Sequence, residues 1–594
     1  MNQNSEISKF IYAEKYLQAG ETFEDGMTRI AGALQDDEPH FRHFRDILLN
    51  QRFLPAGRIQ VAVGATRSTT PYNCFVSGTI EDSMEGICNR FTESLQTMRL
   101  GGGIGYDFST LRPSGEHIAS VDSHSCGPVG DEHRDRGFVD MFDAGCAVIS
   151  SAGHRRGAQM AVLRVDHPDI RHFIRCKRNG HRLTNFNISV GVTDEFMRAV
   201  MEDSEFDLRF SGRVYETIRA RNLWDEIMRS TWDYAEPGVL FLDTINRKNN
   251  LWYCETIAST NPCAEQPLPP FGACLLGSFN LTKYLYDVFP EGKLIGQNIL
   301  VNMDQRFDWE KFTNDIPPVV RAMDNVIDRA IYPLPEQGRE AKSKRRMGLG
   351  VTGLANTAEI LGYRYGSPEM LGFMGEALRI LRDGAYNASI DLAIEKGAFK
   401  EFDNNDYRGV NLYGPQSKSF VTTLPVYIQE LIKKHGIRNS HLLSIAPTGT
   451  ISLAAGNISS GIEPPYTSGV YERAVYQRDG SRRSFRLMDF AESEYRVVGA
   501  TSEECSVEDH VKVLCLASKY VDSSVSKTCN VGPDVSFLEF KDVYRMAYEG
   551  GASGITTFRP AEYGGKREGI LKKATPPEDG AACNINEQGN RTCD

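Results

Sequence analysis

The sequence predicts an α/β fold, and three observations support this. Helical periodicity alternates with short apolar segments over most of the 594 residues, as expected where helices pack on a sheet or barrel. No Pro/Ser/Gly-rich or highly charged run divides the chain in its middle. The composition, with 41% apolar and 24% charged residues, is that of an ordinary globular protein. We therefore expect one large catalytic domain with terminal additions.

Helices are predicted where apolar residues recur at helical spacing between start and stop residues. Asp82 to Leu100 ends at the glycine run Gly101-Gly-Gly-Ile-Gly105, and Ser367 to Lys396 contains a predicted break near Gly384. The other predicted helices are Phe138 to Ser150, Asp169 to Arg178, Thr193 to Asp203, Thr217 to Ala235, Trp309 to Tyr332, Ser506 to Tyr520 and Phe537 to Glu549. The predicted strands are Asn187 to Val190, Gly238 to Leu242, His441 to Ile445 and Gly554 to Phe558.

The glycine run at 101–105 follows a helix rather than a strand, so it is not a dinucleotide-binding fingerprint. We expect its glycines to allow close backbone packing beside a ligand.

The termini differ from the middle of the chain. Residues 1–50 predict a short helical lead-in, and residues 51–563 make up the predicted catalytic domain. Residues 564–594 are rich in Gly, Pro, Lys and Asn with little apolar periodicity, which predicts a mobile tail. This tail carries Cys583 and Cys593, which are either incidental thiols or a pair that exchanges disulfides with a buried site.

Composition excludes several classes of function. A formal charge of -11 gives no electrostatic footprint for nucleic acid. No apolar run of about 18 residues or charged-then-apolar leader is present, so we expect no membrane association and a cytoplasmic protein. The thirteen cysteines are scattered without framework spacing, which indicates a reducing compartment. No Cys-x-x-Cys or His-Glu-x-x-His motif predicts a metal site.

The segment Asn261-Pro-Cys263-Ala-Glu265 places an amide, a thiol and a carboxyl two residues apart. If the segment is extended, these three side chains point to one face, because successive residues alternate sides. Together they would offer a hydrogen-bond donor, a sulfur and a proton acceptor to one small ligand.

Two further cysteines suggest redox chemistry. Cys74 lies far upstream, and Cys274 lies shortly after Cys263. A two-electron redox enzyme needs two thiols that can form a disulfide, which requires Cα atoms within roughly 7 Å. A cysteine hydrolase is less well supported, because no histidine lies near Cys263 in the sequence. Taken alone, each cysteine could also be a small buried apolar residue.

A possible phosphate-binding turn follows the apolar segment at 441–445. Pro447, Thr448, Gly449, Thr450 and Ile451 form a turn that leads into a predicted helix. Backbone N–H groups at such a start, with two hydroxyls, suit a phosphate group. The alternative is a capped strand-to-helix connection that binds no ligand.

Four motifs in one order resemble ribonucleotide reductase. They are Asn-Pro-Cys-Ala-Glu-Gln-Pro-Leu at 261–268, Gly-Ala-Cys-Leu-Leu-Gly-Ser at 272–278, Ile-Ala-Pro-Thr-Gly-Thr-Ile-Ser at 445–452 and Ser-Ser-Gly-Ile-Glu-Pro at 459–464. Their order and spacing are similar to the family from about Phe53 to Arg559. The resemblance implies a ten-stranded α/β barrel with a central finger loop that carries the radical cysteine.

The resemblance also implies residue roles. Cys263 would become a transient thiyl radical that abstracts the ribose 3′-hydrogen, Glu265 would take the 3′-hydroxyl proton, and Asn261 would bond the substrate hydroxyls. Cys74 and Cys274 would supply two electrons and end as a disulfide. The segment Pro447 to Ile451 would hold the substrate phosphates.

The class of reductase is indicated by the C-terminal motif. Class I catalytic subunits carry a tyrosine pair after a Gly-x-x-Thr segment, whereas this chain reads Gly554-Ile-Thr-Thr557-Phe558-Arg559. The sequence looks more similar to class II, in which adenosylcobalamin generates the radical. No glycyl-radical motif of class III is visible.

Family resemblance further implies regulation and partners. Asp82, Ser83, Arg156 and Arg178 lie in segments that resemble the dNTP effector site and its communicating loops. A homodimer is expected, because family effectors bind at a helical dimer interface. The segment before Phe53 is shorter than the family's optional ATP cone, so no such cone is expected. A thioredoxin or glutaredoxin-type reductant would act through Cys583 and Cys593, and the substrate would be a ribonucleotide, taken here as a diphosphate.

Three other interpretations compete with this one. A class I-type subunit would need a separate metal-containing partner and would be inactive with adenosylcobalamin alone. A non-catalytic nucleotide-binding regulator would have no use for a redox pair around a third thiol. A thiol-dependent acyl transferase would partly tolerate Cys263→Ser, whereas a radical enzyme would not.

Overall fold

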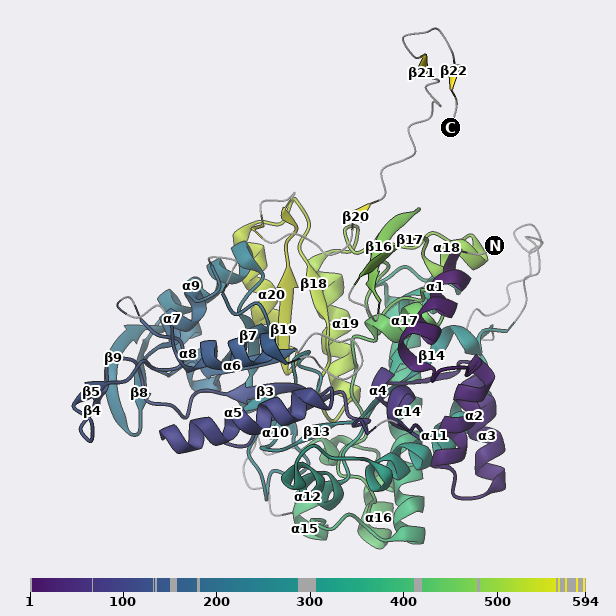
Figure 1. Cartoon of the computed structure of the whole chain (residues 1–594), viewed down its shortest axis with the longest axis horizontal. Coiled ribbons are helices and arrows are strands. Elements are labelled where there is room, and N and C mark those ends of the chain that lie inside the picture. The colour runs from purple at the N-terminus through teal and green to yellow at the C-terminus, as the bar shows by residue number, and fades with distance from the viewer. Residues whose placement is uncertain are drawn as a thin grey trace.

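The α/β fold predicted from the sequence is confirmed in the computed structural model of the chain (Figure 1). The structure describes residues 3–66, 68–131, 133, 136–149, 158–178, 182–286, 306–410, 419–477, 481–561 and 565–566, and the short strands at 572–573, 584–585 and 591–592. Within these ranges no helix is both long and apolar enough to cross a membrane.

The largest sheet has eight strands in the order β13-β2-β3-β6-β7-β10-β19-β18. Their bounds are β2 (Cys74–Val76), β3 (Gly103–Asp107), β6 (Gln159–Arg164), β7 (Phe186–Val192), β10 (Gly238–Phe241), β13 (Ala273–Cys274), β18 (Thr528–Asn530) and β19 (Gly554–Phe558). The neighbours from β2 to β10 are parallel. At the two ends of this parallel set, β13 and β19 pair with it in the antiparallel sense.

A second sheet has the order β1-β14-β15, with β1 (Phe53–Pro55), β14 (Leu276–Asn280) and β15 (Gly348–Thr352). Only Leu275 separates β13 from β14, so one segment of chain takes part in both sheets. An isolated parallel bridge joins Leu349 of β15 to Leu443, and a second joins Ile445 to Val525. The predicted strand at 441–445 is therefore present as bridging backbone and not as a continuous strand.

Most predicted helices are confirmed within a few residues. They are α5 (Met84–Arg99), α6 (Phe138–Val148), α7 (Ile170–Arg175), α8 (Asp194–Glu202), α9 (Ala220–Tyr234), α11 (Trp309–Arg329), α14 (Pro368–Lys396), α19 (Val507–Tyr520) and α20 (Phe537–Glu549). Helices α5, α7, α9, α19 and α20 pack against strands of the large sheet, as does the unpredicted α10 (Leu242–Lys248). The apolar runs of β6 and β10 fit this position, because strands covered on both faces need no polar alternation.

Two predictions about helix boundaries are wrong. Residues 217–219 belong to β9 (Arg213–Arg219), which forms a hairpin with β8 (Glu205–Phe210), and α9 begins only at Ala220. Helix α14 continues through Gly384 without a break. A Cβ at Gly384 would lie 2.9 Å from Ile316 Cδ1, so this glycine serves close packing against α11.

Other elements were not predicted. The helices are α4 (Gly57–Ala62), α12 (Pro335–Lys344), α13 (Leu354–Ile360), α15 (Asn404–Tyr407), α16 (Val426–His435) and α18 (Phe490–Tyr495), with short turns η2 (Leu281–Tyr284) and η4 (Phe420–Thr423). Helix α17 (Gly449–Ala454), by contrast, is the helix expected after the turn at 447–451. The strands are β4 (His117–Ile118), β5 (Ser123–His124), β11 (Ser259–Thr260), β12 (Pro267–Leu268), β16 (Tyr471–Tyr476), β17 (Arg482–Leu487), β20 (Lys572–Lys573), β21 (Asn584–Ile585) and β22 (Arg591–Thr592).

The first fifty residues are helical, with α1 (Gln3–Ile11), η1 (Tyr12–Tyr16), α2 (Phe23–Leu34) and α3 (Glu38–Leu49). Helices α2 and α3 pack on α11, and α1 packs on α17 and β17. Their buried residues join the same apolar cluster as the rest of the chain. These helices are therefore packed into the main body.

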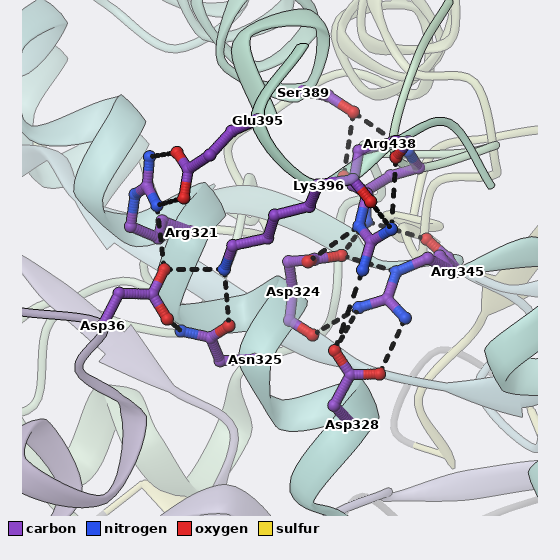
Figure 2. Close-up of polar contacts among 12 residues, drawn as sticks. Asp36, Arg321, Asp324, Asn325, Asp328, Arg345, Ser389, Glu395, Lys396 and Arg438 are labelled. Atoms are coloured by element: carbon purple, nitrogen blue, oxygen red, sulfur yellow. Dashed lines mark hydrogen bonds and ion pairs between the residues drawn. The ribbon is translucent and has the colours of Figure 1, made fainter. Parts of the chain in front are cut away.

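A polar network fixes the turn between α2 and α3 to the body (Figure 2). The Asp36 carboxylate accepts hydrogen bonds from Arg321 Nη1 at 2.8 Å, Lys396 Nζ at 2.6 Å and Asn325 Nδ2 at 2.8 Å. These donors come from α11 and α14. The same figure shows a second group centred on Asp324, which pairs with Arg345 at 2.8 Å and Arg438 at 3.2 Å.

Candidate active site

The segment that carries Cys263 is the tip of a small hairpin made by β11 and β12. At the tip, Asn261 N–H donates to Gln266 O at 3.1 Å, and Ala264 N–H donates to Asn261 O at 3.0 Å. Ala264 adopts a left-handed backbone with φ of 63°. The segment 261–265 is therefore not extended, and the condition for placing its three side chains on one face is not met, because the backbone folds back on itself as a tight turn. We call residues 259–268 the finger hairpin.

Glycines let the finger hairpin approach the large sheet closely. A Cβ at Gly105 of β3 would overlap the carbonyl oxygen of Thr260, and a Cβ at Gly103 would lie 3.2 Å from Pro262 Cγ. Asn187 of β7 donates through Nδ2 to Pro262 O at 2.8 Å. The glycine run at 101–105 thus serves close backbone packing, as expected, with the finger hairpin as the packed segment.

The opposite side of the finger hairpin faces the second sheet. A Cβ at Gly348 of β15 would clash with the Gln266 side-chain amide. A Cβ at Gly350 would clash with the carbonyl oxygen of Ser444. The hairpin therefore lies between β3 of one sheet and β15 of the other, with glycines on both sides.

The two outlying cysteines meet beside the finger tip. Cys74 of β2 and Cys274 of β13 are direct partners in an antiparallel pair. Directly opposed residues in such a pair have Cα atoms about 4.5–5.5 Å apart, which lies within the range that a disulfide spans. Both side chains are buried, and no disulfide joins the described cysteines.

Contacts with the finger tip locate Cys74 and Cys274 relative to Asn261 and Pro262. Asn261 Nδ2 lies 4.0 Å from Cys274 Sγ. The position of a Cβ on Gly103 is 3.2 Å from Cys74 Sγ and also 3.2 Å from Pro262 Cγ. One thiol is therefore beside Asn261 and the other beside Pro262, so the structure brings three predicted cysteines into one site.

The three side chains of the finger tip differ in their exposure to solvent. Asn261 is fully buried and Glu265 is 2% exposed, whereas Cys263 is partly exposed. Asn261 also accepts from Gln266 N–H through Oδ1 at 3.0 Å, so its amide stabilises the turn. Cys263 is the thiol of the three that a ligand can approach directly.

The backbone of Glu265 is held by two serines. Its carbonyl oxygen accepts from Ser444 Oγ at 2.8 Å and from Ser524 N–H at 3.0 Å. Behind them, the carboxylate of Asp522 accepts from Leu442 N–H at 2.8 Å and Leu443 N–H at 2.9 Å. Burial raises the pKa of Asp522 to about 6. The bridging backbone at 442–445 is thereby fixed to the finger hairpin.

The predicted phosphate turn follows this bridging backbone directly. Thr448 has a left-handed backbone, and α17 begins at Gly449 as the sequence predicts. Thr450 is exposed and Gly449 is partly exposed. A Cβ at Gly449 would have no neighbouring atom within 4 Å. Ser444, which contacts Glu265, lies only three residues before Pro447, so the turn begins close to the finger hairpin.

One face of the large sheet is accessible beside the finger tip. Asn187 of β7 and Thr556 of β19 are exposed although both strands are internal to the sheet. A Cβ at Gly238 of β10 would lie 3.0 Å from Ser189 Oγ and 3.5 Å from Thr556 Oγ1. These groups therefore share one face, and Thr528, the register partner of Thr556, belongs to it as well. We call this the accessible face.

Two of the predicted effector residues, Asp82 and Ser83, make structural contacts around the start of α5. Ser83 caps α5 by accepting from Gly86 N–H at 3.0 Å, and Asp82 pairs with Arg112 at 2.8 Å. Arg178 lies in the turn after α7 and is half-buried. Arg156, Cys583 and Cys593 lie outside the described residues.

Sequence reasoning missed several residues that support the site. Thr352 contacts Thr448 of the phosphate turn, and Asn356 contacts Ser459. Ser444 holds the finger hairpin, and Asp522 holds the backbone beside Ser444. The alternating glycines of Gly348-Leu-Gly350 were a signal of close approach by another segment. No sequence signal distinguished Asp522 from other acidic residues. In the described part of the chain, no group of three or more His, Cys, Asp or Glu residues is arranged to hold a metal ion.

Comparison with known proteins agrees with this geometry. Residues 72–558 match the family described as ribonucleotide reductase, barrel domain. The chain is 32% identical over 591 residues to the vitamin B12-dependent ribonucleoside-diphosphate reductase of Mycobacterium tuberculosis (strain CDC 1551 / Oshkosh), which covers 94% of this chain and 78% of that protein. It is 31% identical to the protein of the same description from Thermoplasma acidophilum, over 91% of this chain and 67% of that protein.

A more distant relative is the ribonucleoside-diphosphate reductase large subunit of vaccinia virus (strain Copenhagen). The identity is 27%, over 68% of this chain and 53% of that protein. The family match spans most of the chain, and the M. tuberculosis relative exceeds 30% identity over nearly all of it. This chain therefore belongs to the ribonucleotide reductase family.

Proposed function

We propose that this chain reduces ribonucleoside diphosphates to 2′-deoxyribonucleoside diphosphates by radical chemistry that depends on adenosylcobalamin. The observation that carries this proposal is the placement of Cys74 and Cys274 as direct partners beside the finger tip that carries Cys263. The names of the relatives from M. tuberculosis and T. acidophilum support both the substrate level and the cofactor.

Cys263 starts the reaction as a thiyl radical. A sulfur radical can take the 3′-hydrogen of ribose, which an acid or base at neutral pH cannot remove from an unactivated carbon. Glu265, two residues along the same turn, accepts the 3′-hydroxyl proton. Cys263 is the accessible thiol of the tip, and the backbone of Glu265 is held by Ser444 and Ser524, which supports a fixed position for the buried Glu265 side chain.

Cys74 and Cys274 supply the electrons. The 2′-hydroxyl leaves as water, the two thiols lose two electrons and two protons in total, and a sulfur–sulfur bond forms between them. Atoms balance as one ribonucleotide and two thiols giving one deoxyribonucleotide, one disulfide and one water. The hydrogen atom that Cys263 removed returns to C3′, so this thiol is regenerated.

The accessible face fits the nucleoside part of the cofactor. It carries the exposed side chains of Thr556 and of Asn187, whose Nδ2 donates to Pro262 O, and Gly238 leaves room where a side chain would otherwise stand. Adenosylcobalamin, when bound, supplies a carbon radical through homolysis of its cobalt–carbon bond. These residues would hold the group, and Cys263, the partly exposed thiol of the finger tip, would be the hydrogen-atom donor.

The segment Pro447 to Ile451 holds the substrate phosphates in this proposal. The left-handed Thr448 and the short α17 set its conformation, and the partly exposed Gly449 leaves its backbone approachable. Backbone N–H groups suit phosphate oxygens because they carry partial positive charge.

We also propose that the strands close into a ten-stranded barrel around the finger hairpin. The two bridges support this, because they continue the large sheet from Val525, beside β18, through Ile445 and Leu443 to β15. The shared segment β13–β14 returns to β2. The ring would contain β2, β3, β6, β7, β10, β19, β18, the backbone at 443–445, β15 and β14 with β13.

Regulation and partners follow the family resemblance. We propose that a dNTP effector binds near Asp82, Ser83, Arg156 and Arg178 in a homodimer. Cys583 and Cys593 would return electrons from a thioredoxin or glutaredoxin-type protein to the buried pair. The N-terminal fifty residues would form a helical lead-in to the catalytic domain.

The test is reduction of ribonucleoside di- and triphosphates by the purified chain with dithiothreitol, a dNTP and adenosylcobalamin. Deoxynucleotide should form with this chain alone, should require cobalamin, and should be lost in Cys263→Ser. A chain that stays inactive with cobalamin but becomes active with a metal-containing partner subunit would establish the class I-type alternative.

A further inference from the structure

Thr448, in the predicted phosphate segment, has an unusual backbone. It is the N-cap residue of α17, with φ of 54° and ψ of 14°. A β-branched residue rarely adopts this left-handed conformation, because its branched Cβ crowds the backbone. A threonine at an N-cap usually accepts a hydrogen bond from a first-turn N–H through its hydroxyl. Thr448 makes no such bond.

The hydroxyl of Thr448 is held elsewhere. Its Oγ1 lies 2.9 Å from the Oγ1 of Thr352 and accepts from Gly461 N–H at 2.7 Å. Thr352 is fully buried at the end of β15, and Thr448 is 8% exposed. Water therefore cannot easily replace either partner.

Proton counting gives these bonds a direction. Each hydroxyl has one hydrogen to donate. Thr352 donates its hydrogen to Ser459 O at 3.1 Å, so in the hydroxyl pair Thr448 is the donor and Thr352 the acceptor. The Thr448 hydroxyl thus donates to Thr352 Oγ1 and accepts from Gly461 N–H. Both bonds orient the hydroxyl away from the first turn of α17.

We propose that Thr352 is a positioning residue for the substrate phosphates. By holding the Thr448 hydroxyl, it fixes the left-handed conformation and prevents the side chain from capping the first turn of α17. The backbone N–H groups of Thr450 and Ile451 are then kept for the ligand. This inference rests on the proposed role of the segment at 447–451.

Asn356 fixes the partner of Thr352. Its Oδ1 accepts from Ser459 N–H at 2.6 Å, and its Nδ2 donates to the Asp489 carboxylate at 2.8 Å. Gly353 N–H donates to Ser459 O at 2.9 Å. Because Ser459 is held on three sides, the Thr352 hydroxyl has a fixed acceptor and its own position is set.

The chain offers a matched control. Thr357 is also fully buried, lies five residues further on, and donates from Oγ1 to Gly353 O at 2.8 Å within its own helix. Thr352→Val and Thr357→Val each remove one buried hydroxyl and leave a side chain of nearly the same shape. Only the first removes the partner of Thr448.

The experiment measures nucleoside diphosphate binding to the full chain by calorimetry, with steady-state kinetics beside it. Thr352→Val should weaken binding about tenfold and raise KM with kcat within about twofold, whereas Thr357→Val should change neither. Thr352→Ser should restore binding. Equal affinity in Thr352→Val and wild type, or an equal loss in Thr357→Val, would overturn the proposal.

A crystal structure of Thr352→Val separates this inference from the proposed function. The Thr448 hydroxyl should turn to accept from Thr450 or Ile451 N–H, whether or not the protein reduces nucleotides. A hydroxyl that stays on Gly461 alone contradicts the positioning role. Absence of nucleotide binding in wild type would instead contradict the proposed function. If Thr352→Val does not fold, Thr352→Cys, of similar size and with a weaker donor, replaces it with the same expected direction.

Discussion

At the scale of single residues, the site depends on side chains whose structural roles cannot be recognised from the amino-acid type alone. Asn261 was expected from the family resemblance to bond the substrate, yet its Oδ1 accepts from Gln266 N–H and so stabilises the turn. The register of Cys74 against Cys274 could not be predicted, because their strands are two hundred residues apart in the sequence. Motif spacing identified the reactive side chains, but it could not identify the residues that hold them.

Cys274→Ser should abolish deoxynucleotide formation, by about a thousandfold or more on the scale of removed catalytic groups. Serine keeps the shape of the buried side chain but cannot form a disulfide, so the two electrons are lost. The measurement is product formation with dithiothreitol, together with a thiol titration after turnover without reductant. Wild type should lose two thiols for each deoxynucleotide formed, and the variant none. The exposed Cys254→Ser should behave as wild type; turnover by Cys274→Ser would exclude the proposed pair.

Glu359→Gln should stabilise the protein increasingly as pH rises. Burial and the nearby charge of Asp489 raise the pKa of Glu359 to about 9. In wild type the stability that this protonated group contributes is present below its unfolded pKa, near 4.5, and is lost as pH rises toward 9. The loss is on the order of 1.4 kcal/mol per pH unit over this range.

Calorimetric Tm values of both proteins at pH 5 and pH 8 provide the measurement. The Tm difference in favour of Glu359→Gln should be small at pH 5 and several degrees at pH 8. A difference that does not change with pH would mean that Glu359 is ionised in the folded protein. Asn356 keeps its bonds to Asp489 in both proteins, so the comparison isolates the proton on Glu359.

At the scale of secondary structure, long amphipathic helices were predictable and short strands were not. Helices such as α5 and α19 carry their own start and stop residues, so local sequence is sufficient. The hairpin of β8 and β9 alternates irregularly and exposes many charged residues, which hides its strand character. The turn at 261–265 is held by Asn261 and by close packing against β3 and β15, and the residue pattern reveals neither.

Gly105→Ala should displace the finger hairpin and lower activity about a hundredfold. The new methyl group would overlap the Thr260 carbonyl, which is backbone and cannot rotate away. A displacement of about 1 Å from productive geometry can cost this much. Product formation and circular dichroism on the same sample provide the measurement.

Gly372→Ala is the control for this substitution, because Gly372 lies on exposed α14 surface with no atom near its substituent position. It should retain full activity. Full activity in Gly105→Ala would show that the finger hairpin tolerates displacement, and the close packing on β3 would then have no catalytic role.

At the scale of the whole molecule, buried ion pairs connect segments that are distant in sequence. Asp324 is fully buried and pairs with Arg345, whose side chain is 5% exposed, and with Arg438. Figure 2 shows this group beside the Asp36 contacts that hold the N-terminal helices. The α/β class was predictable from composition and periodicity, whereas these contacts depend on the packing of α11 and α14 and have no local signature.

Asp324→Ala should destabilise the protein by about 3–5 kcal/mol, because it leaves the Arg345 and Arg438 charges without their buried partner. Urea unfolding followed by circular dichroism measures this. The comparison is Glu336→Ala, which breaks an exposed pair with Arg339 and should cost at most about 1 kcal/mol. Similar losses in the two variants would contradict a special role for the buried group.

The position of the cysteine pair has a mechanical consequence. Cys74 and Cys274 lie where β2 meets β13, which is the antiparallel junction between the parallel set of strands and the segment that continues into the second sheet. Each turnover in the proposed reaction would therefore form a disulfide cross-link across this junction, and each re-reduction would break it. Hydrogen exchange at β2 and β13 should slow in the oxidised protein and recover on reduction. The redox state of the enzyme would therefore control the local flexibility of this strand pair.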